Sequence, residues 1–282
     1  MDPQKVKKKV INDLRDEIPE LIMASNDFTL ERLSSKKNIV YELIFKKNPD
    51  KFPKEVILKL FRTNYAEKEY EALIKLEKQG LPIPKVLYFK KPYLILKKLE
   101  GVNLCDFIND NLVNITAIDE LDLEIRDKII VSVKKLAEWI ANLHSQNIIT
   151  KKDTFEIIVF NKGDTRLRDF IYNTTKNIIY GIDFEESYEG NFLDDLAWIS
   201  CSLLDTNPGI FEVSEPMIKI ELINYFLREY FRMNKTFLFS FDYFAERLIE
   251  NLNIVIKRRA LELSPVRKSV ILKNISKDLQ IS

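Results

Sequence analysis

Hydrophobic residues recur along this 282-residue chain in two spacings, one typical of strands and the other of helices. Short alternating or apolar runs predict strands at 28–33, 39–45, 56–61, 92–96, 157–160 and 178–182. Hydrophobic residues three and four positions apart predict amphipathic helices from the N-terminus to about Met23, at 65–79, from about Asn103, and at 124–144, 216–233 and 239–263. Strands are therefore expected from Phe28 onward, and long helices dominate the second half.

Charge and composition exclude several classes of protein. The chain has 44 Lys and Arg against 43 Asp and Glu, so neither a nucleic-acid-coating protein nor an acidic tail is indicated. The basic cluster Lys5, Lys7, Lys8 and Lys9 could touch a membrane or RNA, but a solvated helix face is the favoured interpretation. No apolar run is long enough for a membrane span, and the basic N-terminus does not resemble a signal peptide. We expect a cytoplasmic protein without a nucleic-acid partner.

Three residue types are scarce, and their scarcity limits the chemistry. The two cysteines, Cys105 and Cys201, lack metal-ligand spacing and fit a reducing compartment. A single histidine, His144, argues against a histidine-based catalytic system or a zinc site. None of the six glycines precedes residue 80, so a glycine-rich phosphate loop or a dinucleotide-binding fold is not expected.

Acidic residues follow two short apolar strands in the middle of the chain. Asp164 comes after the strand at 157–160, Asp169 lies five residues further on, and Asp183 follows the strand at 178–182. Each aspartate alone fits a turn, where this residue is common. Together they supply what phosphoryl transfer requires, which is one carboxylate to orient the attacking hydroxyl and oxygen ligands for Mg²⁺.

The spacing of these residues resembles the catalytic core of the aminoglycoside phosphotransferase-like branch of the protein-kinase-like superfamily. That pattern has His-Gly-Asp, Asn five residues after the Asp, Asp-Phe-Gly or Asp-Phe-Glu, and then Asp-Leu-Ala. Here the same frame reads Lys162-Gly163-Asp164, Asp169, Asp183-Phe184-Glu185 and Asp195-Leu196-Ala197. The resemblance covers about residues 28–204.

One lysine interrupts the apolar strand at 56–61. Alternation places Lys59 on the face opposite Val56, Leu58 and Leu60, where a buried ammonium group needs an anionic partner. The following helix offers three glutamates, Glu67, Glu69 and Glu71. The resemblance selects Glu69, which stands eleven residues before Gly80 in a frame that continues with Pro82 and Pro84. The alternative is an edge-strand lysine that reaches into solvent.

The resemblance also implies contacts with ATP in the first part of the chain. The turn 34–38 would cover the phosphates, with Ser34 and Ser35 in place of glycines, although an ordinary hairpin turn explains the turn equally well. The Lys97 carbonyl and the Leu99 amide would bind adenine. His144 ends its helix in a Leu-His pair, for which a structural role is favoured over a catalytic one.

By the same resemblance, Asp164 would orient the substrate hydroxyl while Asp183 and Asp169 hold Mg²⁺, with Mn²⁺ as the alternative ion. Asp169 takes the place of the family's Asn and Lys162 that of its His. The extra negative charge would be offset by Lys162, Arg166 and Arg168, which surround it, and Arg166 or Arg168 would neutralise charge in the transition state. The two departures leave a weakened enzyme or a pseudokinase open, but the three acidic positions favour an active enzyme.

The fold implied is an α+β bilobal kinase-like domain, with a small antiparallel-sheet lobe at 1–98, a mainly helical lobe at 99–282 and ATP in the cleft. Between Asp183 and Asp195 there is no room for the long activation segment of a protein kinase, so a small-molecule hydroxyl is the preferred phosphate acceptor. A protein acceptor is the second hypothesis and a non-enzymatic nucleotide-binding partner protein the third. The last seventy-odd residues match no known pattern, and Arg258, Arg259, Arg267 and Lys268 are interpreted as a basic surface. The sequence indicates no oligomeric state.

Overall fold

The computed structural model describes residues 3–14, 18, 28–35, 37–47, 52–113, 115, 117–151, 157–207, 209–212, 216–262 and 272–276. The chain divides into two compact units. The N-terminal unit comprises Met1–Lys78 and Ile83–Leu99, and the C-terminal unit comprises Gln79–Pro82 and Glu100–Ser282.

In its described residues, the N-terminal unit is an antiparallel sheet with two helices. Its elements are α1 (Pro3–Leu14), β1 (Phe28–Leu33), β2 (Ile39–Phe45), β3 (Glu55–Leu60), α3 (Ala66–Lys78), β4 (Val86–Lys90) and β5 (Tyr93–Lys97). The five strands lie in the order β1-β2-β3-β5-β4. The bounds of β1 and β2 agree with the predicted strands, and those of β3 and β5 differ from the prediction by one residue at each end.

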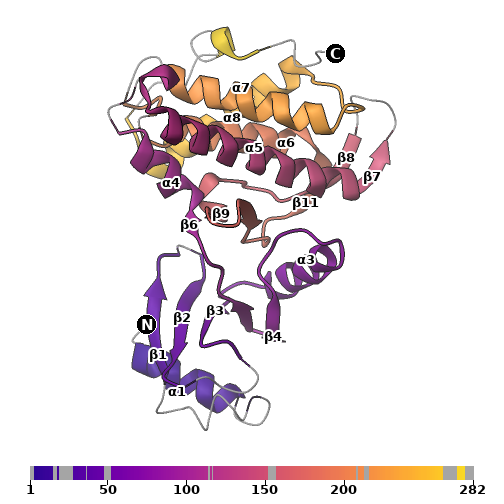
Figure 1. Ribbon diagram of the computed structural model, residues 1–282. Helices are drawn as coiled ribbons and strands as arrows, with labels where there is room; N and C mark the ends of the chain where they lie inside the picture. The colour runs from indigo at the N-terminus through magenta and orange to yellow at the C-terminus, as the bar shows by residue number, and fades with distance from the viewer. Residues whose placement is uncertain are drawn as a thin grey trace. The chain divides into compact units, whose positions relative to one another are not determined.

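Helix α1 supplies the hydrophobic cover for one face of this sheet (Figure 1). Val6, Val10 and Leu14 lie four residues apart on one side of the helix and are buried with Val56 and Leu58 of β3. Because side chains alternate along a strand, this packing leaves Lys59 for the opposite face of the sheet. The continuation of the predicted N-terminal helix through Leu21 to Met23 lies outside the described residues, as does Asp2.

Where the structure describes it, the C-terminal unit combines four long helices with two small sheets (Figure 1). Its elements are β6 (Val102–Asn103), α4 (Leu104–Asn111), α5 (Leu123–Gln146), β7 (Ile148–Lys151), β8 (Ile157–Asn161), β9 (Phe170–Asn173), β10 (Ile178–Gly181), β11 (Tyr188–Asn191), α6 (Leu193–Asp205), α7 (Met217–Met233) and α8 (Phe241–Arg259), with 3-10 turns η1 (Ile118–Glu120), η2 (Leu167–Asp169) and η3 (Leu272–Asn274). The sheets have the orders β10-β9-β6 and β11-β8-β7.

Apolar and aromatic side chains fill the space between these helices. The predicted stripe of α5 is buried, from Ile129 to Leu143, and the aromatic residues Phe226 and Tyr230 of α7 are fully enclosed. Phe192 stacks against Tyr230 with ring centroids 6.1 Å apart. These aromatic residues therefore form part of the core of this unit. Within the part of the chain that the structure describes, no helix combines the length and hydropathy that crossing a membrane requires.

Candidate functional site

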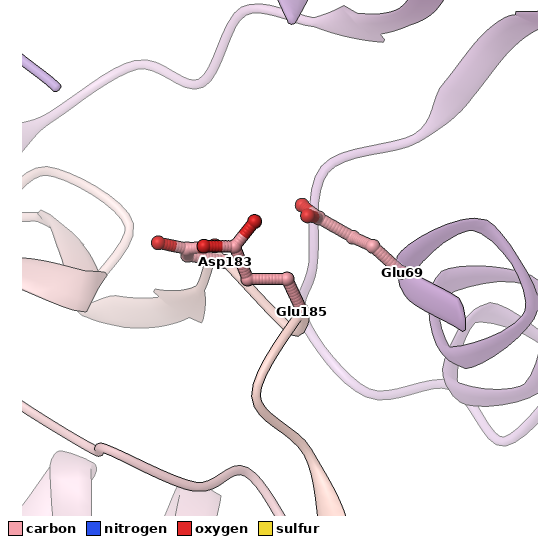
Figure 2. Close-up of side chains that lie close together, drawn as sticks. All are labelled: Glu69, Asp183 and Glu185. Carbon is pink, nitrogen blue, oxygen red and sulfur yellow. The ribbon is translucent and has the colours of Figure 1, made fainter. Parts of the chain in front are cut away.

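In the N-terminal unit, Lys59 of β3 forms an ion pair with Glu69 of α3. Lys59 Nζ lies 2.5 Å from Glu69 Oε2, and the two side chains are only 8% and 2% exposed. Figure 2 shows the Glu69 side chain extending from its helix. The other two candidate partners, Glu67 and Glu71, are exposed. Since burying two charges costs solvation energy, the pair is a specific feature of this unit and not an incidental surface contact.

The turn between β1 and β2 and the end of β5 have ordinary backbone structure. Ser35 Oγ accepts a hydrogen bond from the Asn38 amide at 3.3 Å, which closes the hairpin turn, and Ser34 is exposed. Lys97 is the last residue of β5 and donates its amide to the Lys85 carbonyl. Leu99 is the final residue of the N-terminal unit. These positions permit the predicted backbone contacts with a nucleotide, which remain predictions.

In the C-terminal unit, the acidic residues lie on loops with strained backbone. Asp164 and Asp183 both adopt the left-handed region, with φ of 43° and 63°, which non-glycine residues rarely occupy. Gly163 also has a positive φ, of 75°, and a Cβ atom there would lie 2.2 Å from the Glu186 carbonyl oxygen. Only glycine fits this close approach of the two loops. Strain of this kind concentrates at functional sites when the surrounding structure holds it in place.

Asp195, in the first turn of α6, holds the loop that carries Asp164. Its carboxylate accepts hydrogen bonds from the Lys162 amide at 2.7 Å, the Gly163 amide at 3.0 Å and Thr165 Oγ1 at 2.5 Å. His144 Nε2 lies 3.2 Å away, and its Nδ1 lies 2.9 Å from the Tyr230 hydroxyl. Burial acts to raise the pKa of Asp195, but the hydrogen bonds from His144, Thr165 and the Lys162 amide outweigh it and lower the pKa. His144 thus supports the loop, in agreement with the structural role predicted for it.

Asp164 lies between two arginines. Arg166 Nη2 is 3.2 Å from Asp164 Oδ2, and Arg258 Nη1 donates to both carboxylate oxygens at 2.9 and 3.1 Å. Arg258 belongs to the last turn of α8 and lies 94 residues along the chain from its partner. Arg258 and Arg259 are both exposed, as the interpretation as a basic surface requires, but each also pairs with a carboxylate, Arg258 with Asp164 and Arg259 with Asp205 at 2.8 Å. Arg267 and Lys268 lie outside the described residues.

Asp169 is buried beside Lys162 and Arg166. Its Oδ2 atom lies 3.8 Å from both Lys162 Nζ and Arg166 Nε, and it accepts a hydrogen bond from the Arg166 amide at 3.2 Å. Burial raises the pKa of Asp169, with the neighbouring charge of Asp183 acting in the same direction and Lys162 and Arg166 opposing it. A buried position rules out a surface aspartate here.

Arg168 differs from the other two basic residues predicted to surround Asp169. Its side chain is exposed, and among the described residues it forms no ion pair with Asp169 or Asp164. The expectation that three basic side chains surround Asp169 is therefore wrong for Arg168, because the turn η2 directs its side chain to solvent. Its carbonyl accepts a hydrogen bond from the Asn103 side chain at 2.7 Å.

Lys162 is fully buried and connects the two acidic loops. Its ammonium group donates to the Asp183 carbonyl at 2.9 Å and lies over the rings of Phe170 and Phe184, 5.6 and 5.4 Å from their centroids. A carbonyl oxygen, a nearby carboxylate and two aromatic faces together replace much of the water that a buried ammonium group loses. Lys162 thus holds the Asp183 loop in place.

The carboxylates of this unit fit a divalent cation. Asp183 and Glu185 come from the same loop and point toward each other (Figure 2), with carboxylate oxygens within 4.8 Å. Asp169 is close enough to Asp183 for its charge to raise the pKa of Asp169. Hard cations such as Mg²⁺ and Mn²⁺ prefer oxygen ligands of this kind. Glu185 follows Asp183 by two residues but was not among the site residues predicted from the sequence.

Comparisons with known proteins concern both the sequence and the fold. The family model described as RIO domain matches residues 29–161, slightly less than half of the chain. No curated protein matches the chain in sequence.

Three solved structures resemble the whole chain. An amicoumacin kinase in complex with AMP-PNP, Ca²⁺ and Ami has 15% identity and a TM-score of 0.50, covering 96% of this chain and 95% of that chain. A choline/ethanolamine kinase family protein from Mesorhizobium loti has 12% identity and a TM-score of 0.52, with 95% and 92% covered. A choline kinase from Streptococcus pneumoniae has 15% identity and a TM-score of 0.54, with 91% and 93% covered. The predicted α+β kinase-like fold is thereby confirmed, and the likeness extends into the last seventy residues, beyond the limit drawn from sequence.

Proposed function

We propose that this chain is a phosphotransferase of the protein-kinase-like superfamily and that it transfers the γ-phosphate of ATP to a hydroxyl group of a small molecule. The observation that carries this proposal is the placement of Asp169 and of the Asp183 loop against the buried Lys162, two residues before Asp164. Phosphoryl transfer is catalysed mainly by positioning and by electrostatic stabilisation, and fixed carboxylates with fixed cations supply both.

Each residue has a distinct role in the proposed reaction. Asp164 orients the acceptor hydroxyl and takes its proton, while Asp169 and Asp183 are the residues that would hold Mg²⁺. When bound, the cation neutralises charge on the phosphates. Arg166, which already contacts Asp164 and Asp169, is better placed than the exposed Arg168 to neutralise charge in the transition state.

The N-terminal unit contributes the residues proposed to bind ATP. Lys59, oriented by Glu69, would pair with the phosphates, and the backbone of the turn at Ser34 and Ser35 would lie along them. The Lys97 carbonyl and the Leu99 amide would bind adenine. These assignments rest on the sequence frame together with the buried ion pair.

A small-molecule acceptor is supported by the short connection after Asp183. Strand β11 (Tyr188–Asn191) pairs directly with β8, and α6 starts at Leu193. The residues between Asp183 and Asp195 are thus used by a loop, a strand and a helix start, which leaves none for a long segment that could dock a peptide. The match to the RIO domain favours a second candidate, a kinase with a protein acceptor.

Radiolabelled ATP tests the proposal. We expect label to enter a small-molecule extract in the presence of Mg²⁺, and Asp164→Asn to reduce turnover about 10²–10⁴-fold while nucleotide binding persists, because this residue faces the acceptor. Asp110→Asn, an exposed aspartate of α4, is the matched control. Full turnover in Asp164→Asn would contradict the assignment, and label in protein alone would favour the second candidate.

A further inference from the structure

We propose that the phosphate acceptor carries an anionic group, a carboxylate or a phosphate, and that Arg258 binds this group beside Asp164. The inference rests on the proposed phosphotransfer and adds the chemical class of the acceptor to it. It is carried by residues of the C-terminal unit alone, from α6, α8 and the loop that contains Asp164.

The geometry of Arg258 leaves most of its hydrogen-bonding capacity for a ligand. Only Nη1 is used on Asp164, and among the described residues its Nε and Nη2 atoms have no hydrogen-bond partner. The side chain is 47% exposed, whereas that of Asp164 is 11% exposed. Arginine offers five donors in a planar fork that matches the oxygens of carboxylate and phosphate groups. The unused side of the guanidinium group therefore presents an anion site next to the residue that would receive the hydroxyl.

The position of Arg258 is held by its neighbours on α6. Its guanidinium carbon lies 5.5 Å from the centre of the Trp198 ring, in a cation–π arrangement. The next residue, Arg259, pairs with Asp205, which lies seven residues after Trp198 at the end of α6, through its carboxylate at 2.8 Å and its carbonyl at 3.2 Å. These contacts fix the last turn of α8 against α6, so Arg258 reaches Asp164 from an anchored helix end.

Local charge favours an anion over a cation at this place. Asp164 is flanked by Arg166, which also lies 3.8 Å from Asp169, and by Arg258, whose only carboxylate partner among the described residues is Asp164. A cationic acceptor would have to approach Asp164 past the exposed guanidinium group of Arg258, which is unfavourable, while an anionic acceptor pairs with that group. This differs from what the names of the two choline kinase relatives indicate, since choline is a cation.

A purely structural role for Arg258 is the competing explanation. Basic residues in the last turn of a helix interact favourably with the helix dipole, and α8 ends in Lys257, Arg258 and Arg259. The interaction with the helix dipole requires only a positive charge near the C-terminal end of the helix, and the exposed Lys257 supplies it equally well. It does not account for a contact between Arg258 and both oxygens of Asp164.

Matched hydroxyl compounds test the proposal. ADP formation with Mg²⁺ and ATP is measured with glycerate, glycerol 3-phosphate, glycerol and choline, and binding of the two anions is measured by calorimetry. We expect turnover and binding with at least one of the anionic compounds and none with choline. Arg258→Ala should raise the KM for that compound about 10- to 100-fold, the usual loss for a hydrogen bond between charged groups. Arg258→Lys should restore part of it, and Lys257→Ala, which removes the same charge one residue away, should match wild type.

The outcomes separate this inference from the proposed function. Choline as the better acceptor, or no response to either anion in turnover and calorimetry while ATP binds, would overturn the anionic acceptor and leave phosphotransfer standing. A rise in the KM for ATP in Arg258→Ala with an unchanged acceptor preference would make Arg258 a nucleotide-binding residue and would also overturn it. Failure to bind ATP at all would instead remove the proposed function.

Discussion

Lys162 and Asp169 are the two residues at which the chain departs from the pattern it resembles, and they lie 3.8 Å apart. Lysine in place of histidine adds a positive charge, and aspartate in place of asparagine adds a negative one, so the two departures offset each other. Lys162 also keeps a hydrogen bond to the Asp183 carbonyl. Complementary changes of this kind favour a catalytically active site over a pseudokinase.

Substitution of Asp169 tests its proposed role as a metal ligand. Asp169→Asn keeps an oxygen donor, so activity should survive with an altered preference between Mg²⁺ and Mn²⁺, because ligand charge tunes metal affinity. Asp169→Ala removes the donor and should raise the metal concentration needed for half-maximal activity. Metal titrations of both variants and wild type measure this. Three identical curves would remove Asp169 from the metal site and leave Asp183 as its main ligand.

Among the structural elements, α6 has a central role, since its first turn holds the Asp164 loop through Asp195. The carboxylate is completely buried and receives four hydrogen bonds, two from backbone amides, one from Thr165 and one from His144. Asp195→Asn replaces one carboxylate oxygen with an NH₂ group, whose hydrogens would face the groups that now donate hydrogen bonds to Asp195. It should cost about 3–5 kcal/mol in the free energy of unfolding, the range for breaking a buried charged network. Thr165→Val, which removes one of the four, should cost about 1.5–3 kcal/mol, the range for a single hydrogen bond to a charged group.

The pH dependence of stability gives a second measure of the same residue. The pKa of Asp195 is lowered in the folded protein, so its contribution to stability is fully present above the unfolded value of about 3.9 and is lost as the pH falls through the lower folded value. Urea denaturation should show that wild type loses stability below about pH 4. Asp195→Asn should lack this part of the loss. Equal acid sensitivity in both proteins would contradict the network described here.

Elements and local pairs could be predicted from the sequence, and contacts between distant elements could not. The alternation in 28–45 specified β1 and β2. One lysine in an apolar strand indicated an anionic partner in the following helix, and the resemblance selected Glu69, only ten residues away. Arg258 gave no comparable indication, because its contact with Asp164 depends on how α8 packs against α6. Glu185 lay inside a recognised motif, but its proximity to Asp183 is set by the path of the loop.

At the scale of the whole molecule, each compact unit carries its own set of proposed functional residues. Lys59 and Glu69 belong to the N-terminal unit, and Asp164, Asp169 and Asp183 belong to the C-terminal unit. Ligand binding can therefore be tested on the full chain with variants in either unit. A substitution in the N-terminal unit should affect nucleotide binding, and the Asp164 substitution in the C-terminal unit should affect turnover.

The melting temperature in the presence of ATP is the corresponding measurement. ATP with Mg²⁺ should raise it, because a ligand that binds only the folded state stabilises that state, by about 2.7 kcal/mol at 100 times the dissociation constant. Removing Mg²⁺ with a chelator should reduce the shift, since the cation offsets the repulsion between phosphates and carboxylates.

Lys59→Met should also reduce the shift in melting temperature that ATP produces. That variant leaves Glu69 buried without its lysine, which by itself lowers stability. Each shift is therefore measured relative to the melting temperature of the same variant without ATP. The double variant Lys59→Met with Glu69→Gln is measured as well, because it removes both charges of the pair. Lys78→Met, an exposed lysine of α3, should behave as wild type. Equal shifts in the Lys59 variants and wild type would mean that Lys59 does not contact the nucleotide. If ATP at millimolar concentration gave no shift in wild type with either Mg²⁺ or Mn²⁺, the proposed function would lack its nucleotide substrate.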